Sequence, residues 1–286
     1  MAYMKESFIT GLNSSGFHQL HYTDWGDPAN PRVVICVHGL TRNCRDFDAL
    51  ATALQDQFRV ISISMAGRGK SDWLPNKDDY GYVQYMNDTT ALIARITDGG
   101  SKDISWVGTS MGGMLGMLLA AKPNNPIRRL VLNDVGTLIP KASMERIGAY
   151  VGKNPLFDSL DEFVKYVRTV SAPFGPLSDA QWRHLAEHNA RCNAEGRWGM
   201  IYDPGIAQPF HKAAAKDIVL WSYYDAIRCP TLLLRGADSD LLLRETAVEM
   251  TQRGPKPQLV EFAGVGHAPA LMADDQIAAV RNFLLG

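Results

Sequence analysis

The stretch ISWVGTSMGGMLGMLLAA, residues 104–121, is the most informative part of this chain. Its pentapeptide Gly108-Thr-Ser110-Met-Gly112 lies between an apolar run typical of a buried strand and one typical of a helix. A serine at such a strand-to-helix turn has a strained backbone, which costs about 1–3 kcal/mol, and its hydroxyl points out above the sheet. The residues two before and two after it lie close together, and only glycine leaves enough room. The pattern therefore predicts that Ser110 is a nucleophile.

Length, composition and charge exclude several classes of function. The chain has 286 residues, enough for one large α/β domain or for a core with an inserted subdomain. Its formal net charge is −1, which gives no preference for nucleic acid or an anionic membrane. No apolar run reaches the roughly 18 residues of a membrane span, and residues 1–10 lack the apolar segment of a signal peptide. We therefore expect a cytoplasmic protein with no membrane span and no nucleic-acid partner.

The cysteines carry no metal or redox motif, since none of them forms a Cys-x-x-Cys pair. Without an export signal, free thiols are expected in place of disulfides. The four cysteines are Cys36, Cys44, Cys192 and Cys229.

Strand-like and helix-like segments alternate along most of the chain. Such repeated β-α units predict an α/β fold, in which helices cover both faces of a mostly parallel sheet. Ligands bind beyond the carboxyl ends of the strands in sheets of this kind. The expected strands are residues 17–25, 33–37, 59–63, 103–107, 128–133, 230–236 and 258–262, and the expected helices are residues 46–54, 82–96 and 274–285.

The alternation stops between residues 137 and 224. This segment is helix-like and rich in aromatic residues, and it has no clear strand run. We expect about one in three of its prominent aromatic side chains to line a pocket and the others to pack in the interior. The candidates are Trp182, Trp198, Tyr202, Phe210, Trp221 and Tyr223.

Downstream of Ser110, the chain supplies an acid and a histidine in the order Ser, Asp, His. On these features it resembles the α/β-hydrolase superfamily along nearly its full length. It is similar to the branch with a helical cap between the sixth and seventh core strands, which includes many carboxylesterases. The resemblance implies an eight-stranded type of sheet, a core of residues 1–136 and 225–286, and a cap of residues 137–224.

The resemblance also implies a catalytic triad of Ser110, Asp240 and His267. His267 lies in a loop of small residues and would accept the serine proton near neutral pH. Asp240 precedes three leucines at the end of a predicted strand, as the acid of the family commonly does, and it would orient the imidazole. Asp238 and Asp134 are the alternative acids.

An oxyanion hole requires two backbone N–H groups that point at the developing negative charge. One is expected from Met111, directly after the nucleophile. The other, by the resemblance, is the N–H of Leu40 in His38-Gly39-Leu40, where Gly39 lets the loop approach and His38 braces it. Gly39, Gly108 and Gly112 are thus the structural glycines of the site. Many relatives have histidine where the loop of residues 66–71 has Arg68, a loop that usually supports the site.

Two further features could belong to a site or to the surface. Arg42 follows the predicted oxyanion loop and reaches the pocket in one interpretation, whereas in the other it is an ordinary surface arginine. His184-Leu-Ala-Glu187-His188 matches a pattern of some zinc proteases, but polar residues surround it. We interpret it as a polar cap helix and expect no metal and no cofactor.

The predicted function is the hydrolysis of small carboxylic esters by a serine hydrolase through an acyl-enzyme intermediate. Thioesters, lactones and carbon–carbon bonds are alternative substrates, since the same triad attacks them. A protein of another class, which keeps the fold to bind a ligand with little turnover, is the competing hypothesis. The sequence does not specify the oligomeric state.

Overall fold

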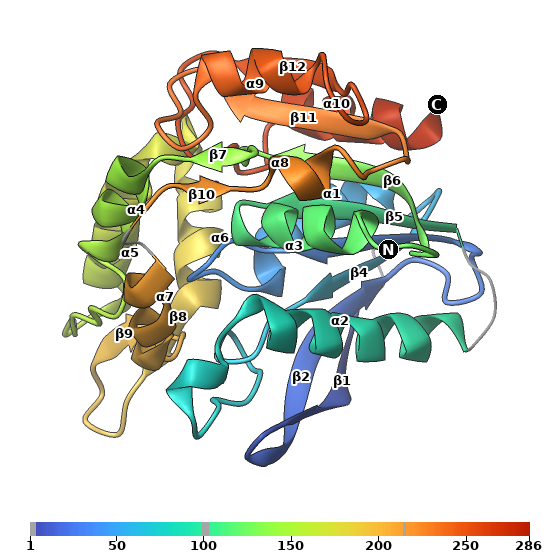
Figure 1. Ribbon diagram of the computed structural model, residues 1–286. Helices are drawn as coiled ribbons and strands as arrows, with labels where there is room; N and C mark the ends of the chain where they lie inside the picture. Colours follow the sequence, from blue (N-terminus) through green and yellow to red (C-terminus); the bar gives the residue numbers. More distant parts are fainter. Residues whose placement is uncertain (1–3, 99–102, 214–215) are drawn as a thin grey trace.

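A mostly parallel sheet of eight strands forms the centre of the computed structural model, which describes residues 4–98, 103–213 and 216–286 (Figure 1). The strand order is β1-β2-β4-β3-β5-β6-β11-β12; β2 runs antiparallel to β1 and β4, and all the other neighbouring strands are parallel. The strands are β1 (Met4–Asn13), β2 (Gly16–Trp25), β3 (Arg32–Val37), β4 (Arg59–Ile63), β5 (Asp103–Thr109), β6 (Ile127–Asn133), β11 (Thr231–Gly236) and β12 (Gln258–Phe262).

Helices cover both faces of the sheet because its central strands are apolar on both sides. In β3, Val33, Ile35 and Val37 belong to the core beneath α2 and α3, whereas Val34 and Cys36 belong to the core beneath α1 and α10. This alternation is the two-residue period of a strand. The covering helices are α1 (Asp48–Leu54), α2 (Tyr82–Thr97), α3 (Met111–Ala120), α9 (Arg244–Met250) and α10 (Asp274–Leu285).

The predicted α/β fold is confirmed, and all seven predicted strands are present with small shifts at their ends. The expected helix at residues 46–54 differs, because a 3-10 turn (Cys44–Phe47) precedes α1. Asn43 caps that turn, since its side chain accepts the N–H of Arg45. The first strand, β1, was not predicted. Within the described ranges, no helix is long and apolar enough to cross a membrane.

The segment between β6 and β11, the sixth and seventh strands of the sheet, gathers beyond one end of the sheet (Figure 1). Two short strands, β7 (Leu138–Ile139) and β10 (Ile218–Val219), pair where this segment leaves and re-enters the rest of the chain. The other elements are α4 (Lys141–Gly148), α5 (Leu160–Val170), α6 (Asp179–Asn189), β8 (Ala190–Cys192), β9 (Trp198–Met200), α7 (Ala207–Ala213) and α8 (Trp221–Tyr224). The expectation of no strand here is wrong, because strands of two or three residues show no measurable alternation in sequence.

Candidate active site

Ser110 lies at the turn between β5 and α3, with φ of 52° and ψ of −114°. This left-handed φ is uncommon for a residue with a side chain and indicates backbone strain. Two backbone contacts explain the flanking glycines. A Cβ on Gly108 would overlap the carbonyl of Gly112, and a Cβ on Gly112 would overlap the carbonyl of Val37 in β3. The turn therefore packs directly against its own strand and the neighbouring one.

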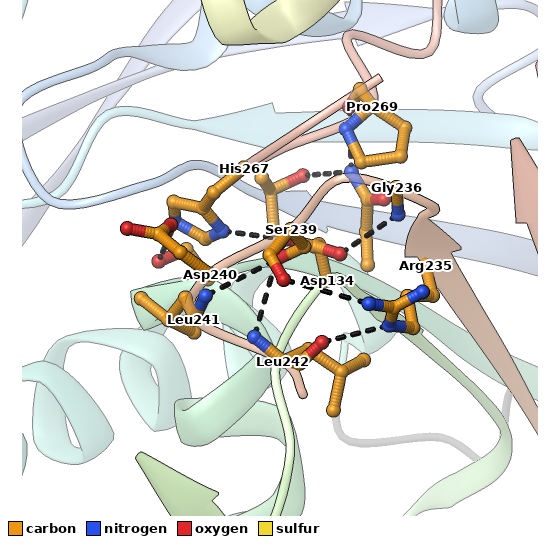
Figure 2. Close-up of polar contacts among 12 residues, drawn as sticks. Asp134, Arg235, Gly236, Ser239, Asp240, Leu241, Leu242, His267 and Pro269 are labelled. Atoms are coloured by element: carbon orange, nitrogen blue, oxygen red, sulfur yellow. Dashed lines mark hydrogen bonds and ion pairs between the residues drawn. The ribbon is translucent and has the colours of Figure 1, made fainter. Parts of the chain in front are cut away.

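His267 joins Ser110 to a buried carboxylate that is not the predicted one. The Nε2 atom of His267 lies 2.9 Å from the Ser110 hydroxyl oxygen. Its Nδ1 atom lies 2.7 Å from Oδ2 of Asp134, a side chain with no solvent exposure (Figure 2). Both distances fit a neutral imidazole that donates to Asp134 through Nδ1 and accepts the serine proton through Nε2.

The prediction that Asp240 holds His267 is wrong. The Asp240 carboxylate is half-exposed and pairs with Arg146, at 2.5 Å from Nε and 2.8 Å from Nη2. Asp238, the first alternative, is exposed as well. After β11 the chain turns so that Ser239 is buried between these two acids. Asp134 is the acid that contacts His267. It directly follows β6, and because β6 pairs with β11, Asp134 lies beside the turn that leaves β11.

Three hydrogen bonds hold the Asp134 carboxylate in its orientation (Figure 2). Besides the His267 ring, the Gly236 N–H donates to Oδ1 at 2.9 Å and the Ser239 hydroxyl donates to Oδ2 at 2.6 Å. The Ser239 oxygen in turn accepts the N–H groups of Leu241 and Leu242. The sequence analysis did not identify Ser239. The one hint in the sequence is that this small polar residue stands between two acids, Asp238 and Asp240.

The loop after β3 is braced by His38, as expected. The ring is fully buried; its Nδ1 lies 2.6 Å from the carbonyl oxygen of Gly39, and its Nε2 accepts the N–H of Met65 at 3.0 Å. Both ring nitrogens are therefore used by a neutral imidazole. Burial lowers the pKa of His38 to about 3, so the ring stays uncharged.

The two N–H groups expected to form the oxyanion hole belong to loops that meet at Ser110. Among the described residues, neither the Leu40 N–H nor the Met111 N–H donates a hydrogen bond. A Cβ on Gly39 would lie 3.8 Å from Cβ of Ser110, so a side chain there would project toward the nucleophile. Glycine thus leaves the space beside Ser110 free. The backbone of Gly39 has an ordinary conformation, so space and not backbone strain explains this glycine.

Arg68 is a fully buried guanidinium beneath these two loops. Its Nε donates to the Leu40 carbonyl at 2.8 Å, and its Nη1 donates to the Tyr85 hydroxyl at 2.7 Å. Its Nη2 lies 3.6 Å from the Met111 sulfur. In the described part of the chain, its hydrogen-bond partners are all neutral groups, and none of them is a carboxylate.

Two cavities meet at Ser110. His267, Arg42, Arg146 and Tyr202 line the first. The second is almost entirely apolar, with Met111, Met114, Ile139 and Phe210 among its lining residues. Arg42 thus reaches the pocket. Of the six aromatic candidates, Tyr202 lines the first cavity and Phe210 lines the second, whereas Tyr223 is exposed.

The two histidines of the zinc-like motif lie beside one carboxylate from another helix. His184 and His188 face Asp48 of α1, and the possible ligand atoms of the three lie within 4.8 Å of one another. Glu187 instead pairs with an arginine of its own helix. The Asp48 carboxylate is occupied by the Arg45 guanidinium, with Nη2 at 2.6 Å, so a cation placed there would compete with that group.

The chain is similar to known proteins along most of its length. Residues 34–280 match the model of the Alpha/beta hydrolase family. A 3-hydroxybutyrate-oligomer hydrolase of Cupriavidus necator is 44% identical, over 98% of this chain and 97% of that protein. Esterase Rv0045c of Mycobacterium tuberculosis is 26% identical, over 80% of this chain and 73% of that protein. A crystal structure of an alpha/beta hydrolase from Novosphingobium aromaticivorans has a TM-score of 0.88 and 37% identity, covering 100% of this chain and 99% of that one.

Proposed function

This chain belongs to the alpha/beta hydrolase family, and from that premise we propose that it hydrolyses carboxylic esters with a triad of Ser110, His267 and Asp134. The observation that carries the proposal is the continuous hydrogen-bonded path from the Ser110 hydroxyl through both nitrogens of His267 to a buried carboxylate. A serine hydroxyl becomes nucleophilic when a base accepts its proton, and this path supplies the base and orients it.

The reaction proceeds in two steps. Ser110 Oγ attacks the ester carbonyl carbon while its proton moves to Nε2 of His267, and the Asp134 carboxylate stabilises the imidazolium. The N–H groups of Leu40 and Met111 bind the oxyanion, and each is worth about 3–4 kcal/mol of barrier lowering. His267 then protonates the leaving alcohol. A water molecule, deprotonated by His267, cleaves the acyl-enzyme and releases the acid.

Hydroxy-acid oligomers are the substrate class that we favour. The Cupriavidus necator relative, named for hydrolysis of 3-hydroxybutyrate oligomers, matches the chain along nearly its whole length. Such oligomers are chains of ester bonds, and two cavities that meet at one nucleophile suit a substrate extending in both directions. Residues 137–224 act as the cap in this proposal, because Arg146, Tyr202 and Phe210 contribute to the cavity walls.

Covalent labelling tests the nucleophile. A fluorophosphonate probe should form one adduct on Ser110, seen by mass spectrometry, and Ser110→Ala should abolish it. Ser110→Ala or His267→Ala should lower kcat on 3-hydroxybutyrate dimer by about 10⁴-fold or more, and the double variant should be little worse.

Two results would contradict the proposal. A folded protein with no adduct would favour a ligand-binding protein with little turnover. An adduct with turnover of thioesters or lactones but not of linear esters would keep the triad and change the substrate class.

A further inference from the structure

The two cavities at Ser110 differ in their relation to His267. The imidazole lines the first cavity and is not among the residues that line the second. In a serine hydrolase, the protonated histidine must deliver its proton to the departing alcohol oxygen. The alcohol part of the ester therefore belongs on the His267 side, in the first cavity, and the acyl part belongs in the second.

The first cavity is also the charged one. Two arginines, Arg42 and Arg146, line it, and among its described lining residues the one acidic residue is Asp46. Asp46 is fully engaged by Arg42, since its two oxygens lie 2.7 Å from Nε and from Nη2. Because these two charges cancel, Arg146 is the arginine of the described lining whose ion-pair partner, Asp240, lies outside the cavity wall.

Arg146 can change partners at little cost. Its only ion pair among the described residues is with Asp240, which does not line the cavity, and the two side chains are 43% and 50% exposed. Ion pairs at that exposure contribute little to stability, because solvent screens both charges. By contrast, Arg42 is buried against Asp46. A carboxylate that enters the first cavity thus meets a planar guanidinium whose competing partner is at the surface.

The second cavity has the opposite chemistry. Met111, Met114, Ile139 and Met144 are among its walls, and none of its described lining residues is charged. It suits an uncharged acyl segment, whose burial is favourable, and gives nothing to compensate a carboxylate. The difference in charge between the two cavities therefore orients an ester that has one charged end, with that end in the first cavity.

We propose that Arg146 recognises a free carboxylate on the alcohol part of the substrate, so that the enzyme removes hydroxy-acid units from the carboxyl end of an oligoester. This inference rests on the proposed function. The contact with Arg146 orients the substrate for the acylation step. In that step the bond from Ser110 Oγ to the acyl carbon forms, and the bond from that carbon to the alcohol oxygen of the terminal hydroxy acid breaks. The Ser110 proton passes through His267 to the departing alkoxide, and the terminal unit leaves as a free hydroxy acid.

The test compares 3-hydroxybutyrate trimer as the free acid with the methyl ester of the same trimer. Wild-type kcat/KM should be at least about tenfold higher for the acid, since only the free carboxylate can form a charge-assisted hydrogen bond with Arg146. In Arg146→Gln the ratio should fall to about one, mainly through KM for the acid. Arg146→Lys should keep part of the preference. Asp240→Asn, which frees the guanidinium, should keep or increase it.

A matched control is Arg183→Gln, which removes an exposed arginine of the same inserted segment that lines neither cavity. Its acid-to-ester ratio should equal that of the wild type. A trimer with an isotope label in its carboxyl-terminal unit gives a second readout that needs no variant, because the first monomer released should carry the label.

Three outcomes would overturn the inference. They are equal wild-type rates on acid and methyl ester, a ratio that Arg146→Gln leaves unchanged, and release of unlabelled monomer first. If neither trimer is cleaved although Ser110 is still labelled by the fluorophosphonate, the oligoester inference fails and the serine hydrolase stands. If labelling fails too, both fail.

Discussion

Asp134 is a carboxylate with no solvent exposure, and three hydrogen bonds compensate its charge. Its own backbone is in the left-handed region, at φ of 53°, which directs the side chain back toward the end of β11. A buried charge held in this way has a single orientation. Its hydrogen bond to Nδ1 therefore fixes the orientation of the His267 ring. The same bond keeps the ring proton on Nδ1, so that Nε2 can accept the proton of Ser110.

Replacing Asp134 by asparagine should therefore lower kcat by about 10⁴-fold, because the amide can donate to Nδ1 and stabilise the wrong tautomer. The measurement is kcat on a short hydroxy-acid ester, with circular dichroism to check folding. Asp238→Asn, an exposed neighbour of Ser239, is the control and should change kcat less than threefold. A 10⁴-fold loss in Asp240→Asn with a small loss in Asp134→Asn would restore Asp240 as the acid.

At the scale of elements, the site depends on how closely α3 approaches the sheet. Gly112 in its first turn lies against the backbone of β3, and Gly108 at the end of β5 lies against Gly112. Trp106 of β5 also donates its indole N–H to the Gly112 carbonyl at 3.0 Å. The helix start is thus fixed by backbone contacts that no side-chain rotation can relieve.

Gly112→Ala should destabilise the protein by about 3 kcal/mol or more, since the added methyl would overlap the Val37 carbonyl and must displace α3 or β3. The midpoint of urea unfolding measures this loss. Gly81→Ala is the control, because a Cβ there would meet nothing within 4 Å; its stability should change by about 1 kcal/mol or less, the cost of alanine at the N-cap of α2. Equal midpoints for the two variants would contradict the steric explanation.

At the scale of the whole molecule, stability depends on pH through histidines that fold uncharged. Burial lowers the pKa of His38 to about 3, whereas in the unfolded chain it is near 6.5. Between these values the unfolded state binds a proton that the folded state does not. The free energy of unfolding therefore rises with pH in this window and falls as the solution is acidified.

His38→Gln should flatten this dependence. Well below pH 6.5, wild-type stability should fall more steeply than that of the variant, by up to about 1.4 kcal/mol per pH unit. Urea unfolding of both proteins at pH 7, 6, 5 and 4 measures the difference in slope. The comparison concerns slopes, so a constant loss of stability in the variant does not affect it. Parallel slopes over the whole range would show that folding does not lower the pKa of His38.

Local patterns were enough for the fold class and for the proposed nucleophile and base. The β-α alternation, the glycines around Ser110 and the loop around His267 each involve residues close together in sequence, where steric demand and period are visible. The first strand, β1, was missed because it is an edge strand with many polar residues, and its ladder with β2 is what makes it a strand.

The acid required the tertiary structure. Asp134 and Asp240 both lie between Ser110 and His267 in the chain, so the order Ser, Asp, His fits either of them. Which one meets the imidazole depends on the pairing of β6 with β11 and on a turn that buries Ser239 and directs Asp240 toward Arg146. Strand neighbours and side-chain directions at a turn are set by contacts between distant segments, and no local pattern encodes them.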